Sequence, residues 1–324
     1  NMDAAVYGAR ASYIGGAAGT ATVLAGQMFG IPVSGTMAHS WVMYYKDEYE
    51  AFKHYAENYP DNTVLLVDTY DTIKSGIPNA IRVAKEVLEP MGKRLKGIRI
   101  DSGDLAYQSI KVRKMLDDAG LQDCKVMVSN SLDEHTISSL NMQKARIDGY
   151  GVGERLITGA SSDYSEDSIS LLGAVYKIAA VEENGEFSPR IKVSGSVEKI
   201  TNPGLKKVYR VYDQNGKAKA DLIAKADETI DMSTEFRFVD PDMPWRNLKF
   251  THCTVKPLQE KIFENGKLIY KLPTLEEIRA YVKKQLEEEI WEEEQRFVNP
   301  HKHYMDMTPD YYDMKMSLLN DSRV

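Results

Sequence analysis

The first half of the chain repeats one pattern: a short apolar run, a cluster of polar residues, and then apolar positions at helical spacing. The clearest apolar runs are residues 64–67, 98–100, 126–128 and 147–150, and an earlier unit occupies residues 31–33. After the first run, Ile73, Ile77 and Ile81 recur at the four-residue spacing of one helix face. Strands that alternate with helices favour parallel pairing through crossover helices, so the pattern predicts an α/β barrel or an open doubly wound sheet.

Polar residues cluster where each predicted strand ends. The clusters are Thr36 with His39, Asp68 with Asp71, Arg99 with Asp101, Ser129 with Asn130, and Gly151 with Gly153. In both candidate folds, the loops after the carboxyl ends of the strands build the active site. We therefore expect these five clusters to lie together.

Some of the polar residues have a purely structural interpretation, because they stand where a predicted helix begins. We expect helix N-caps at Asp71 or Thr72, at Asp104 and at Asp133. The three charged residues that sit at strand ends, where no cap is needed, have no such role. They are Asp68, Arg99 and Asp101.

Arg99 and Asp101 flank Ile100, so both side chains point to the same side of the strand. A strand-end arginine that faces the interior is costly unless it meets an anion, and its planar fork suits a carboxylate or a phosphate. Asp101 is the ion-pair partner of Arg99, a metal ligand, or a group that stabilises positive charge on a substrate.

Two further features add candidate chemistry. His39 follows a predicted strand by a few residues, with Asp68 at the end of a following strand, which suits general-base or nucleophilic use. Gly151 and Gly153 belong to a loop whose backbone N–H groups can face a phosphate. This loop completes neither a dinucleotide fingerprint nor a P-loop, since no Gly-Lys-Ser/Thr follows it.

The pattern changes near residue 174, where strand-like runs on either side of Asn-Gly pairs predict three hairpins. The pairs are at 184–185, 215–216 and 265–266, and the first is flanked by runs at 174–178 and 190–193. We expect a helix from Thr274, whose spacing to Glu277 makes a capping box, to about Phe297. Its acidic residues 287–294 are interpreted as a solvated face, and residues 300–324 as a tail packed on a surface.

Composition and charge exclude several classes of protein. Of the 324 residues, 43% are hydrophobic and 27% charged, which excludes a disordered chain. A formal net charge of −7 argues against a nucleic-acid binder that relies on bulk positive charge. No run of about 20 apolar residues occurs, so no membrane span is expected. Two cysteines are too few for a disulfide framework, and a cytoplasmic location follows as the default.

Taken in order, these motifs resemble the nicotinate phosphoribosyltransferase family. The matching segments are residues 7–11, 13–16, 29–40, 68–72, 97–105, 128–130, 132–134, 150–153 and 172–177. Each segment alone is weak evidence for the family, whereas the full set in this order is highly specific for it. The resemblance extends from about residue 4 to residue 204, and more loosely to the end of the chain.

The resemblance implies an irregular, incomplete α/β barrel of the type II phosphoribosyltransferase kind, with part of a second α/β domain. We place the barrel at residues 1–200, and the hairpins and helix that complete the companion domain at residues 201–324. It also implies a homodimer. A family region that carries an aromatic residue to sandwich the pyridine ring is expected upstream of Asn1.

The activity implied by the resemblance joins nicotinate to the ribose of phosphoribosyl pyrophosphate, giving nicotinate mononucleotide and pyrophosphate in NAD biosynthesis. The transfer is coupled to ATP hydrolysis through a phosphohistidine and uses Mg²⁺, for which we assign no ligands. The implied partners are nicotinate, phosphoribosyl pyrophosphate and ATP, with neither nucleic acid nor membrane.

The resemblance also implies roles for the strand-end residues. His39 matches the transiently phosphorylated histidine, with Asp68 placed to orient its ring, and Asp101 matches the acid near the ribose. Thr36 and Arg99 match positions that hold the nicotinate carboxylate. The region around the ribose 5-phosphate is matched by Ser129, Asn130, Gly151, Gly153 and Glu154.

The chain departs from the family at Glu154, where many members have threonine beside the phosphate, and at residues 161–168, a longer and more acidic segment than usual. Two alternatives stay open. The first is a phosphoribosyltransferase of the same architecture that uses nicotinamide or quinolinate. The second is a truncated barrel that binds phosphate without turnover.

Overall fold

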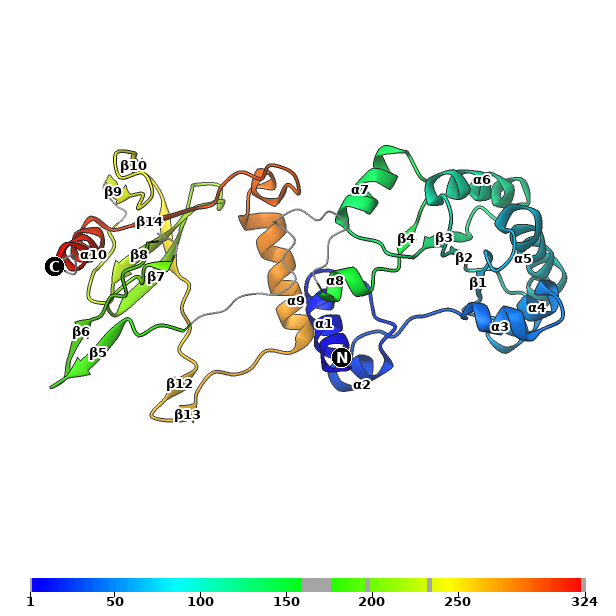
Figure 1. Ribbon diagram of the computed structural model, residues 1–324, viewed down its shortest axis with the longest axis horizontal. Helices are drawn as coiled ribbons and strands as arrows, with labels where there is room; N and C mark the ends of the chain where they lie inside the picture. Colours follow the sequence, from blue (N-terminus) through cyan, green and yellow to red (C-terminus); the bar gives the residue numbers. More distant parts are fainter. Residues whose placement is uncertain (1, 159–175, 196–198, 232–234, 322–324) are drawn as a thin grey trace. The chain divides into compact units, whose positions relative to one another are not determined.

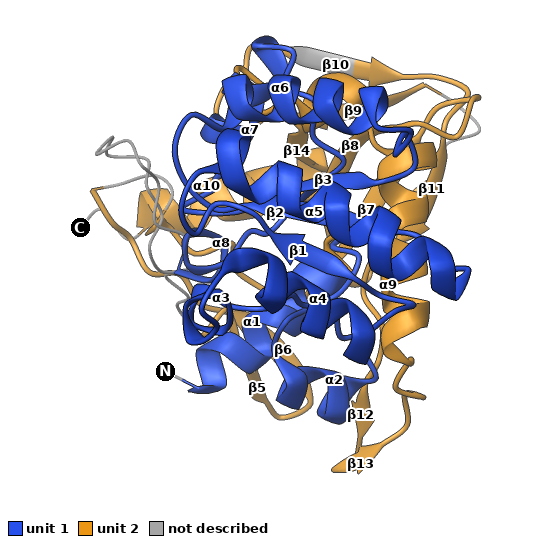
Figure 2. Cartoon of the chain, turned by 90° about the vertical axis from the view of Figure 1, so that its right-hand side faces the viewer, with its two compact units in different colours: residues 1–13, 17–172 blue, residues 14–16, 173–324 orange. Residues whose placement is uncertain are grey.

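Figure 1 shows the computed structural model of the chain, which describes residues 2–158, 176–195, 199–231 and 235–321. The chain divides into two compact units, distinguished by colour in Figure 2. Unit 1 comprises Asn1–Tyr13 and Ala17–Leu172, and unit 2 comprises Ile14–Gly16 and Gly173–Val324. The domain boundary at residue 200 stays a prediction. The acidic segment 161–168 lies outside the described residues, as do residues 174–175 of the first predicted hairpin.

Unit 1 is built on a four-stranded parallel sheet in the order β1-β2-β3-β4. The strands are β1 (Val64–Leu66), β2 (Gly97–Ile100), β3 (Lys125–Val128) and β4 (Gly149–Tyr150). The connecting helices are α5 (Ile77–Val83), α6 (Leu105–Asp118) and α7 (Glu134–Met142) (Figure 1). These strands and helices confirm four of the five predicted strand–helix units.

The fifth predicted strand, at residues 31–33, is wrong. Val33 makes only an isolated parallel bridge to Thr20. Pro32 lacks the backbone N–H group that a strand interior needs, and only its carbonyl oxygen is used, by the N–H of Thr20 at 3.0 Å. The segment therefore runs extended between α2 (Val23–Phe29) and α3 (His39–Tyr44) without joining the sheet.

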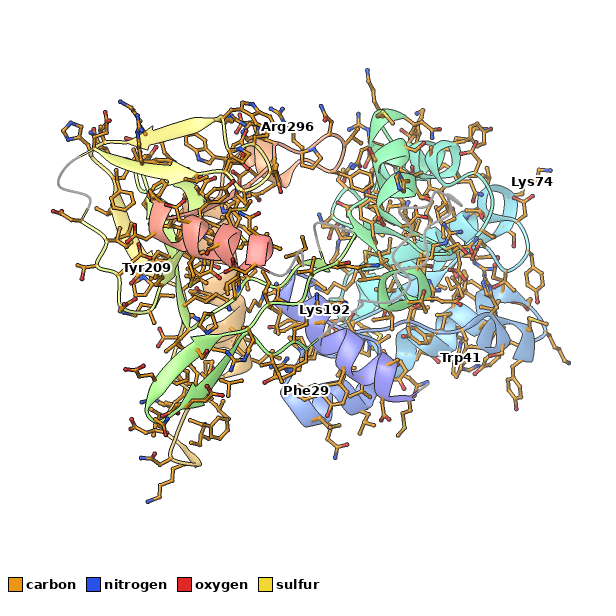
Figure 3. All side chains as sticks on the ribbon, turned by 60° about the vertical axis from the view of Figure 1, so that its left-hand side comes forward. Phe29, Trp41, Lys74, Lys192, Tyr209 and Arg296 are labelled. Atoms are coloured by element: carbon orange, nitrogen blue, oxygen red, sulfur yellow. The ribbon has the colours of Figure 1, made fainter. Side chains whose placement is uncertain are left out.

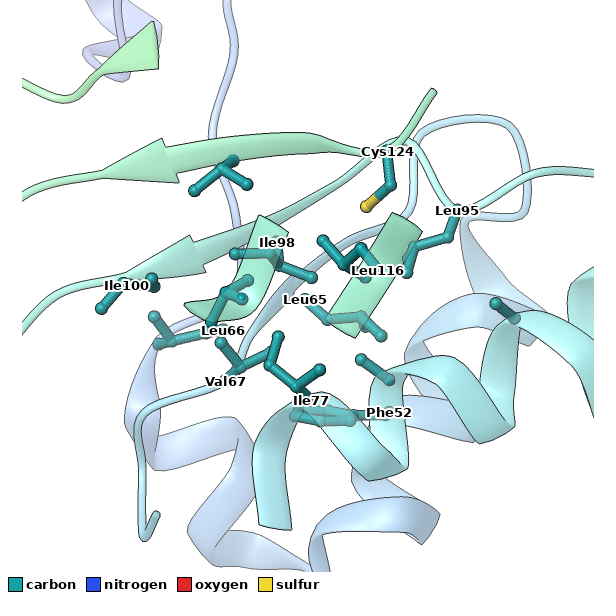
Figure 4. Packing of buried hydrophobic residues seen from close by; sticks show 14 of the residues in the cluster. Phe52, Leu65, Leu66, Val67, Ile77, Leu95, Ile98, Ile100, Leu116 and Cys124 are labelled. Atoms are coloured by element: carbon teal, nitrogen blue, oxygen red, sulfur yellow. The ribbon is translucent and has the colours of Figure 1, made fainter. Parts of the chain in front are cut away.

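The core of unit 1 packs the sheet against its helices (Figure 4). Leu65 and Ile98 from the sheet, Phe52 from α4 (Glu48–Asn58) and Leu116 from α6 are all completely buried. Each such side chain contributes about 1.5–3 kcal/mol relative to an exposed position. This rigid core fixes the ends of the strands from which the predicted site residues extend.

Close packing and capping set the path of the loops after the strands. A Cβ atom at Gly76 would lie 1.9 Å from the carbonyl oxygen of Val67, so only glycine allows the helical segment Thr72–Gly76 to pack directly on the chain after β1. The predicted caps are confirmed. The carboxylate of Asp71 accepts from the N–H groups of Ile73 and Lys74, and Asp104 and Asp133 cap α6 and α7 in the same way.

Unit 2 contains a six-stranded sheet in the order β10-β9-β14-β8-β7-β11. Its strands are β7 (Lys206–Tyr212), β8 (Ala218–Lys225), β9 (Phe236–Val239), β10 (Asn247–Phe250), β11 (Thr254–Pro257) and β14 (Tyr304–Met307). β14 pairs parallel with β8 and contacts β9, and α10 (Pro309–Asp321) follows it. The prediction of a surface tail at residues 300–324 is therefore wrong, because a central strand lies within it.

The three hairpins form at the predicted Asn-Gly pairs. They join β5 (Ala180–Glu183) to β6 (Glu186–Pro189), β7 to β8, and β12 (Phe263–Glu264) to β13 (Lys267–Leu268). At the first, Asn184 and Gly185 have φ values of 53° and 85°, as a type I′ turn requires. β5 and β6 lie closer to the turn than the predicted runs at 174–178 and 190–193 do.

The predicted helix after Thr274 starts correctly and ends early. α9 (Leu275–Lys284) has the full capping box between Thr274 and Glu277. A helical turn continues to Glu289, and Ile290 then adopts an extended backbone, so the helix does not reach Phe297. The acidic face is also only partly solvated, because Glu289 accepts from the Tyr212 hydroxyl at 2.7 Å and Glu294 contacts His303 at 2.9 Å.

Charged groups tie the segment before β14 to the sheet. Arg210 on β7 donates from Nε and Nη2 to the Asp221 carboxylate on β8, at 2.8 and 3.0 Å. His303 Nε2 lies 3.4 Å from the same carboxylate. Burial raises the pKa of Asp221, but the neighbouring His303 and Arg210 lower it overall, to about 2. Asp221 and Glu294 together raise the pKa of His303.

None of the described helices combines the length and the apolar character needed to cross a bilayer. Cys124 and Cys253 are both buried free thiols.

Two buried carboxyl groups lie where β14 meets β9. Asp306 on β14 is 1% exposed, and neither of its oxygens has a hydrogen-bond partner among the described residues. Asp240, which follows β9, is 2% exposed. Burial, together with the charge of Asp240, raises the pKa of Asp306 to about 6. The folded state therefore disfavours the ionised form of Asp306.

Replacing Asp306 with asparagine is expected to stabilise unit 2 at about pH 8. The penalty for ionised Asp306 is absent below about pH 4, grows between about pH 4 and pH 6, and is complete above about pH 6. The rise from 3.8 to about 6 corresponds to about 3 kcal/mol. Amide hydrogen exchange of β14, corrected for the intrinsic rate, should lose protection from about pH 5 to pH 8 in the wild type and keep it in Asp306→Asn. The exposed Asp313→Asn variant is the control, and lower protection of Asp306→Asn at the higher pH contradicts the prediction.

Candidate active site

Arg99, at the end of β2, is the centre of a hydrogen-bond network that joins three of the predicted clusters. Its Nε donates to Ser129 Oγ at 2.7 Å, its Nη1 to Thr36 Oγ1 at 3.0 Å, and its Nη2 to Asp101 Oδ1 at 2.9 Å. Three of the five N–H donors of the guanidinium are thus engaged by described residues. The other two remain for an anionic ligand, which agrees with the interpretation of Arg99 as an anion-binding fork.

Asp101 is held as a carboxylate within this network. Ser129 Oγ donates to its Oδ1, as does Arg99 Nη2. Burial opposes ionisation, but these two hydrogen bonds and the charge of Arg99 lower the pKa of Asp101 overall. Its second oxygen, Oδ2, lies 3.5 Å from His39 Nε2. A negative charge is therefore available beside the histidine at neutral pH.

His39 is the first residue of α3, and its ring lies among polar groups from two strand ends. The Trp41 indole (labelled in Figure 3) donates to the carbonyl of Ala51 at 3.0 Å, which attaches α3 to α4. His39 Nε2 lies 3.8 Å from Asp68 Oδ1, and its Nδ1 lies 3.1 Å from Thr69 Oγ1. Asp68 is thus beside the ring, as predicted, whereas the hydrogen-bond partner of the ring is Thr69.

Asp68 connects the loops after β1 and β2. Its side chain is 2% exposed, and its Oδ2 accepts from the Asp101 N–H at 2.8 Å and from Ser102 Oγ at 2.6 Å. Its Oδ1, which faces His39, has no hydrogen-bond partner among the described residues. A buried carboxylate oxygen without a partner is costly, so this atom is suited to meet a proton or a cation during the reaction.

A cavity of about 200 Å³ opens beside this network, between the loops after β3 and β4. It is lined by Arg99, Asp101, Ser129, Asn130, Ser131, Leu132, Gly151, Gly153, Glu154 and Arg155. Asn130 and Ser131 both have positive φ, 88° and 48°, a strained backbone of the kind found at functional sites. The structure therefore gathers all five residues predicted around the phosphate at one cavity.

Four polar residues of the site were missed from the sequence: Thr69, Ser102, Ser131 and Arg155. Thr69 and Ser102 directly follow Asp68 and Asp101, so adjacency in the strand-end clusters was the available signal. Arg155 follows the glycine loop and pairs through Nη1 with the buried carboxylate of Asp133. Glu154, at which the short helix α8 (Glu154–Thr158) begins, lines the same cavity as Arg155.

The described residues contain no group of three or more His, Cys, Asp or Glu side chains arranged to hold a metal ion. The carboxylates of Asp68 and Asp101 nevertheless fit Mg²⁺, which usually binds through one or two carboxylates together with water and substrate phosphates. Asp68 Oδ1 is the better placed of the two, because it is buried and has no hydrogen bond.

Comparisons with known proteins cover nearly the whole chain. The family model "Nicotinate phosphoribosyltransferase (NAPRTase) family" matches residues 10–226, and "Nicotinate phosphoribosyltransferase C-terminal domain" matches residues 205–315. The chain is 48% identical over 323 residues to the nicotinate phosphoribosyltransferase of Bacillus subtilis, covering 99% of this chain and 63% of that protein. It is 34% identical over 373 residues to that of Dictyostelium discoideum, covering 99% and 61%.

A solved structure gives the same result. The crystal structure of human nicotinic acid phosphoribosyltransferase aligns with a TM-score of 0.75 and 26% identity, covering 96% of this chain and 66% of the human chain. The chain thus spans slightly less than two thirds of the length of each of these relatives.

Proposed function

Because the chain belongs to the nicotinate phosphoribosyltransferase family, we propose that the protein transfers ribose 5-phosphate from phosphoribosyl pyrophosphate to nicotinate, forming nicotinate mononucleotide and pyrophosphate for NAD biosynthesis. Its fold is the incomplete α/β barrel expected from the sequence, since the human enzyme structure aligns over 96% of the chain. The observation that carries the proposal is the Arg99 network, which sets an anion-binding fork beside an ionised carboxylate.

Arg99 and Thr36 form the subsite for the nicotinate carboxylate in this proposal. The two remaining N–H donors of Arg99 match the two oxygens of a carboxylate, and charge-assisted hydrogen bonds of this kind are strong and directional. Thr36 Oγ1 donates to the Met37 carbonyl at 3.2 Å, a hydrogen bond that a substrate carboxylate would have to replace in order to accept from this hydroxyl. An uncharged nicotinamide ring leaves the fork without a counter-charge.

Asp101 stabilises the sugar as its bond to pyrophosphate breaks. The ribose C1 then gains positive charge, and a fixed carboxylate nearby lowers the energy of this state without reorganising. Asn130, Gly151, Gly153 and Arg155 line the cavity that takes the 5-phosphate. Asp68 and Asp101, together with the substrate phosphates, would hold Mg²⁺, which would supply charge compensation for the departing pyrophosphate.

His39 couples the transfer to ATP through transient phosphorylation. A phosphoryl group adds about −1.5 to −2 of charge, by analogy with other phosphorylated side chains. The ring lies 3.5 Å from Asp101, so this charge changes the field at the substrate site and the affinity for phosphoribosyl pyrophosphate. The homodimer and the cytoplasmic location belong to the same proposal.

Pyrophosphate release with nicotinate, nicotinamide or quinolinate, each with and without ATP, tests the function. We expect release that depends on nicotinate and rises with ATP. Release with nicotinamide or quinolinate alone favours the related transferases instead. Binding of phosphoribosyl pyrophosphate without any release identifies a non-catalytic barrel.

Replacing His39 with alanine is expected to leave basal transfer detectable and to abolish its stimulation by ATP. The ring is the group that accepts the phosphoryl, whereas the Arg99 network does not include it. The ratio of rates with and without ATP, together with labelling by γ-³²P-ATP, measures the effect. His54→Ala, which removes a histidine from α4, serves as the control. ATP stimulation that persists in His39→Ala means that the phosphohistidine is elsewhere.

A further inference from the structure

Ser129 is more constrained than a residue that simply lines a phosphate cavity. It directly follows β3 and is 8% exposed. Its hydroxyl accepts from Arg99 Nε at 2.7 Å and donates to Asp101 Oδ1, so its only proton is already used within the site. A phosphate oxygen accepts hydrogen bonds and cannot use this hydroxyl unless the contact with Asp101 breaks.

The backbone of Ser129 is fixed as firmly as its side chain. Its N–H donates at 3.1 Å to the carbonyl of Ile100, the residue between Arg99 and Asp101. On the other side, a Cβ atom at Gly151 would lie 3.2 Å from Ser129 Cβ, which shows how closely the loop after β4 packs on it. Ser129 is thus held between two neighbouring strand ends, and its hydroxyl cannot move independently of Arg99 and Asp101.

We propose that Ser129 is a positioning residue. It holds Arg99, which binds the nicotinate carboxylate, at a fixed distance from Asp101, which faces the ribose. This role rests on the proposed transferase function. The nicotinate ring nitrogen must approach the ribose carbon at near-contact distance, and a small displacement of either subsite costs much of the rate. Arg99 Nη2 donates to the same Asp101 oxygen at 2.9 Å, so the three side chains close a ring of contacts.

Steady-state kinetics of Ser129→Ala test the proposal. We expect kcat/KM for nicotinate to fall about 10- to 100-fold, the loss typical when a hydrogen bond to a charged group is removed. KM for phosphoribosyl pyrophosphate should stay near the wild-type value, because the substitution removes no phosphate contact.

Ser129→Thr keeps the hydroxyl and should return kcat/KM for nicotinate toward the wild-type value. Ser138→Ala on α7 is the matched control, with no expected change. An unchanged kcat/KM for nicotinate in Ser129→Ala overturns the proposal, as does a rise confined to KM for phosphoribosyl pyrophosphate. A wild-type protein that releases no pyrophosphate with nicotinate refutes the proposed function, whereas an active wild type with an unaffected Ser129→Ala refutes only the positioning role.

Discussion

Replacing Asp101 with asparagine is expected to lower kcat for nicotinate mononucleotide formation by about 10²- to 10³-fold, the loss typical when one preorganised electrostatic contact to a transition state is removed. Asparagine has nearly the same shape, and its carbonyl oxygen still accepts from Ser129 and Arg99. The substitution therefore removes the charge and leaves the geometry. Because the charge acts on the sugar cation that forms only in the transition state, kcat falls while KM for nicotinate stays nearly constant.

Steady-state kinetics with both substrates measure this effect. Asp118→Asn, which alters an exposed carboxylate at the end of α6, should match the wild type and controls for the change in net charge. A kcat within about threefold of the wild type would mean that Asp101 serves only as the ion-pair partner of Arg99, the structural interpretation that the sequence also allowed.

Replacing Arg99 with lysine is expected to lower kcat/KM for nicotinate by about 10²- to 10³-fold. A lysine ammonium has three donors and no planar fork, so it cannot serve Ser129, Thr36, Asp101 and a substrate carboxylate together. Charge-assisted hydrogen bonds contribute about 1.5–3 kcal/mol each, and the loss of one or two of them accounts for this range.

The preference for nicotinate over nicotinamide is the sharper measurement. It should fall in Arg99→Lys, because the fork distinguishes the carboxylate from the amide. Arg82→Lys is the control, since Arg82 pairs with Glu86 on the surface of α5. An unchanged preference for nicotinate over nicotinamide would show that a group other than Arg99 recognises the nicotinate carboxylate. In that case the role assigned to Arg99 from both sequence and geometry is wrong.

Unit 1 was predictable from the sequence because its signals are local. Helical spacing from Ile73, the caps at Asp71, Asp104 and Asp133, and the polar residues after each run all lie within a few residues of the feature they specify. Parallel strands then bring their carboxyl ends to one edge, which is how Arg99, Asp101 and Ser129 meet. Thr36 reaches Arg99 from the segment before α3, which is not part of the sheet. The failure at residues 31–33 has a local cause as well, the missing N–H group of Pro32.

Unit 2 and the finer contacts of the site depend on residues far apart in the sequence. Nothing in the run Tyr304–Met307 indicates that it pairs with Ala220–Ile223, because the pairing crosses about 80 intervening residues. The contact of Thr69 with His39 and the double engagement of Ser129 depend on side-chain positions set by the packed sheet. The sequence identified Ser129 as a site residue through the resemblance, and only the geometry separates phosphate binding from positioning.

Because β14 lies in the middle of its sheet, the sheet cannot be completed until the C-terminal part of the chain has been synthesised. Until Tyr304–Met307 leave the ribosome, β8 lacks its parallel neighbour, and β8 and β9 each expose an unpaired edge in the nascent chain. Unpaired edges of this kind template association with other chains. A translation intermediate that stops before residue 304 is therefore expected to need a chaperone, however completely the upstream parallel sheet has already folded.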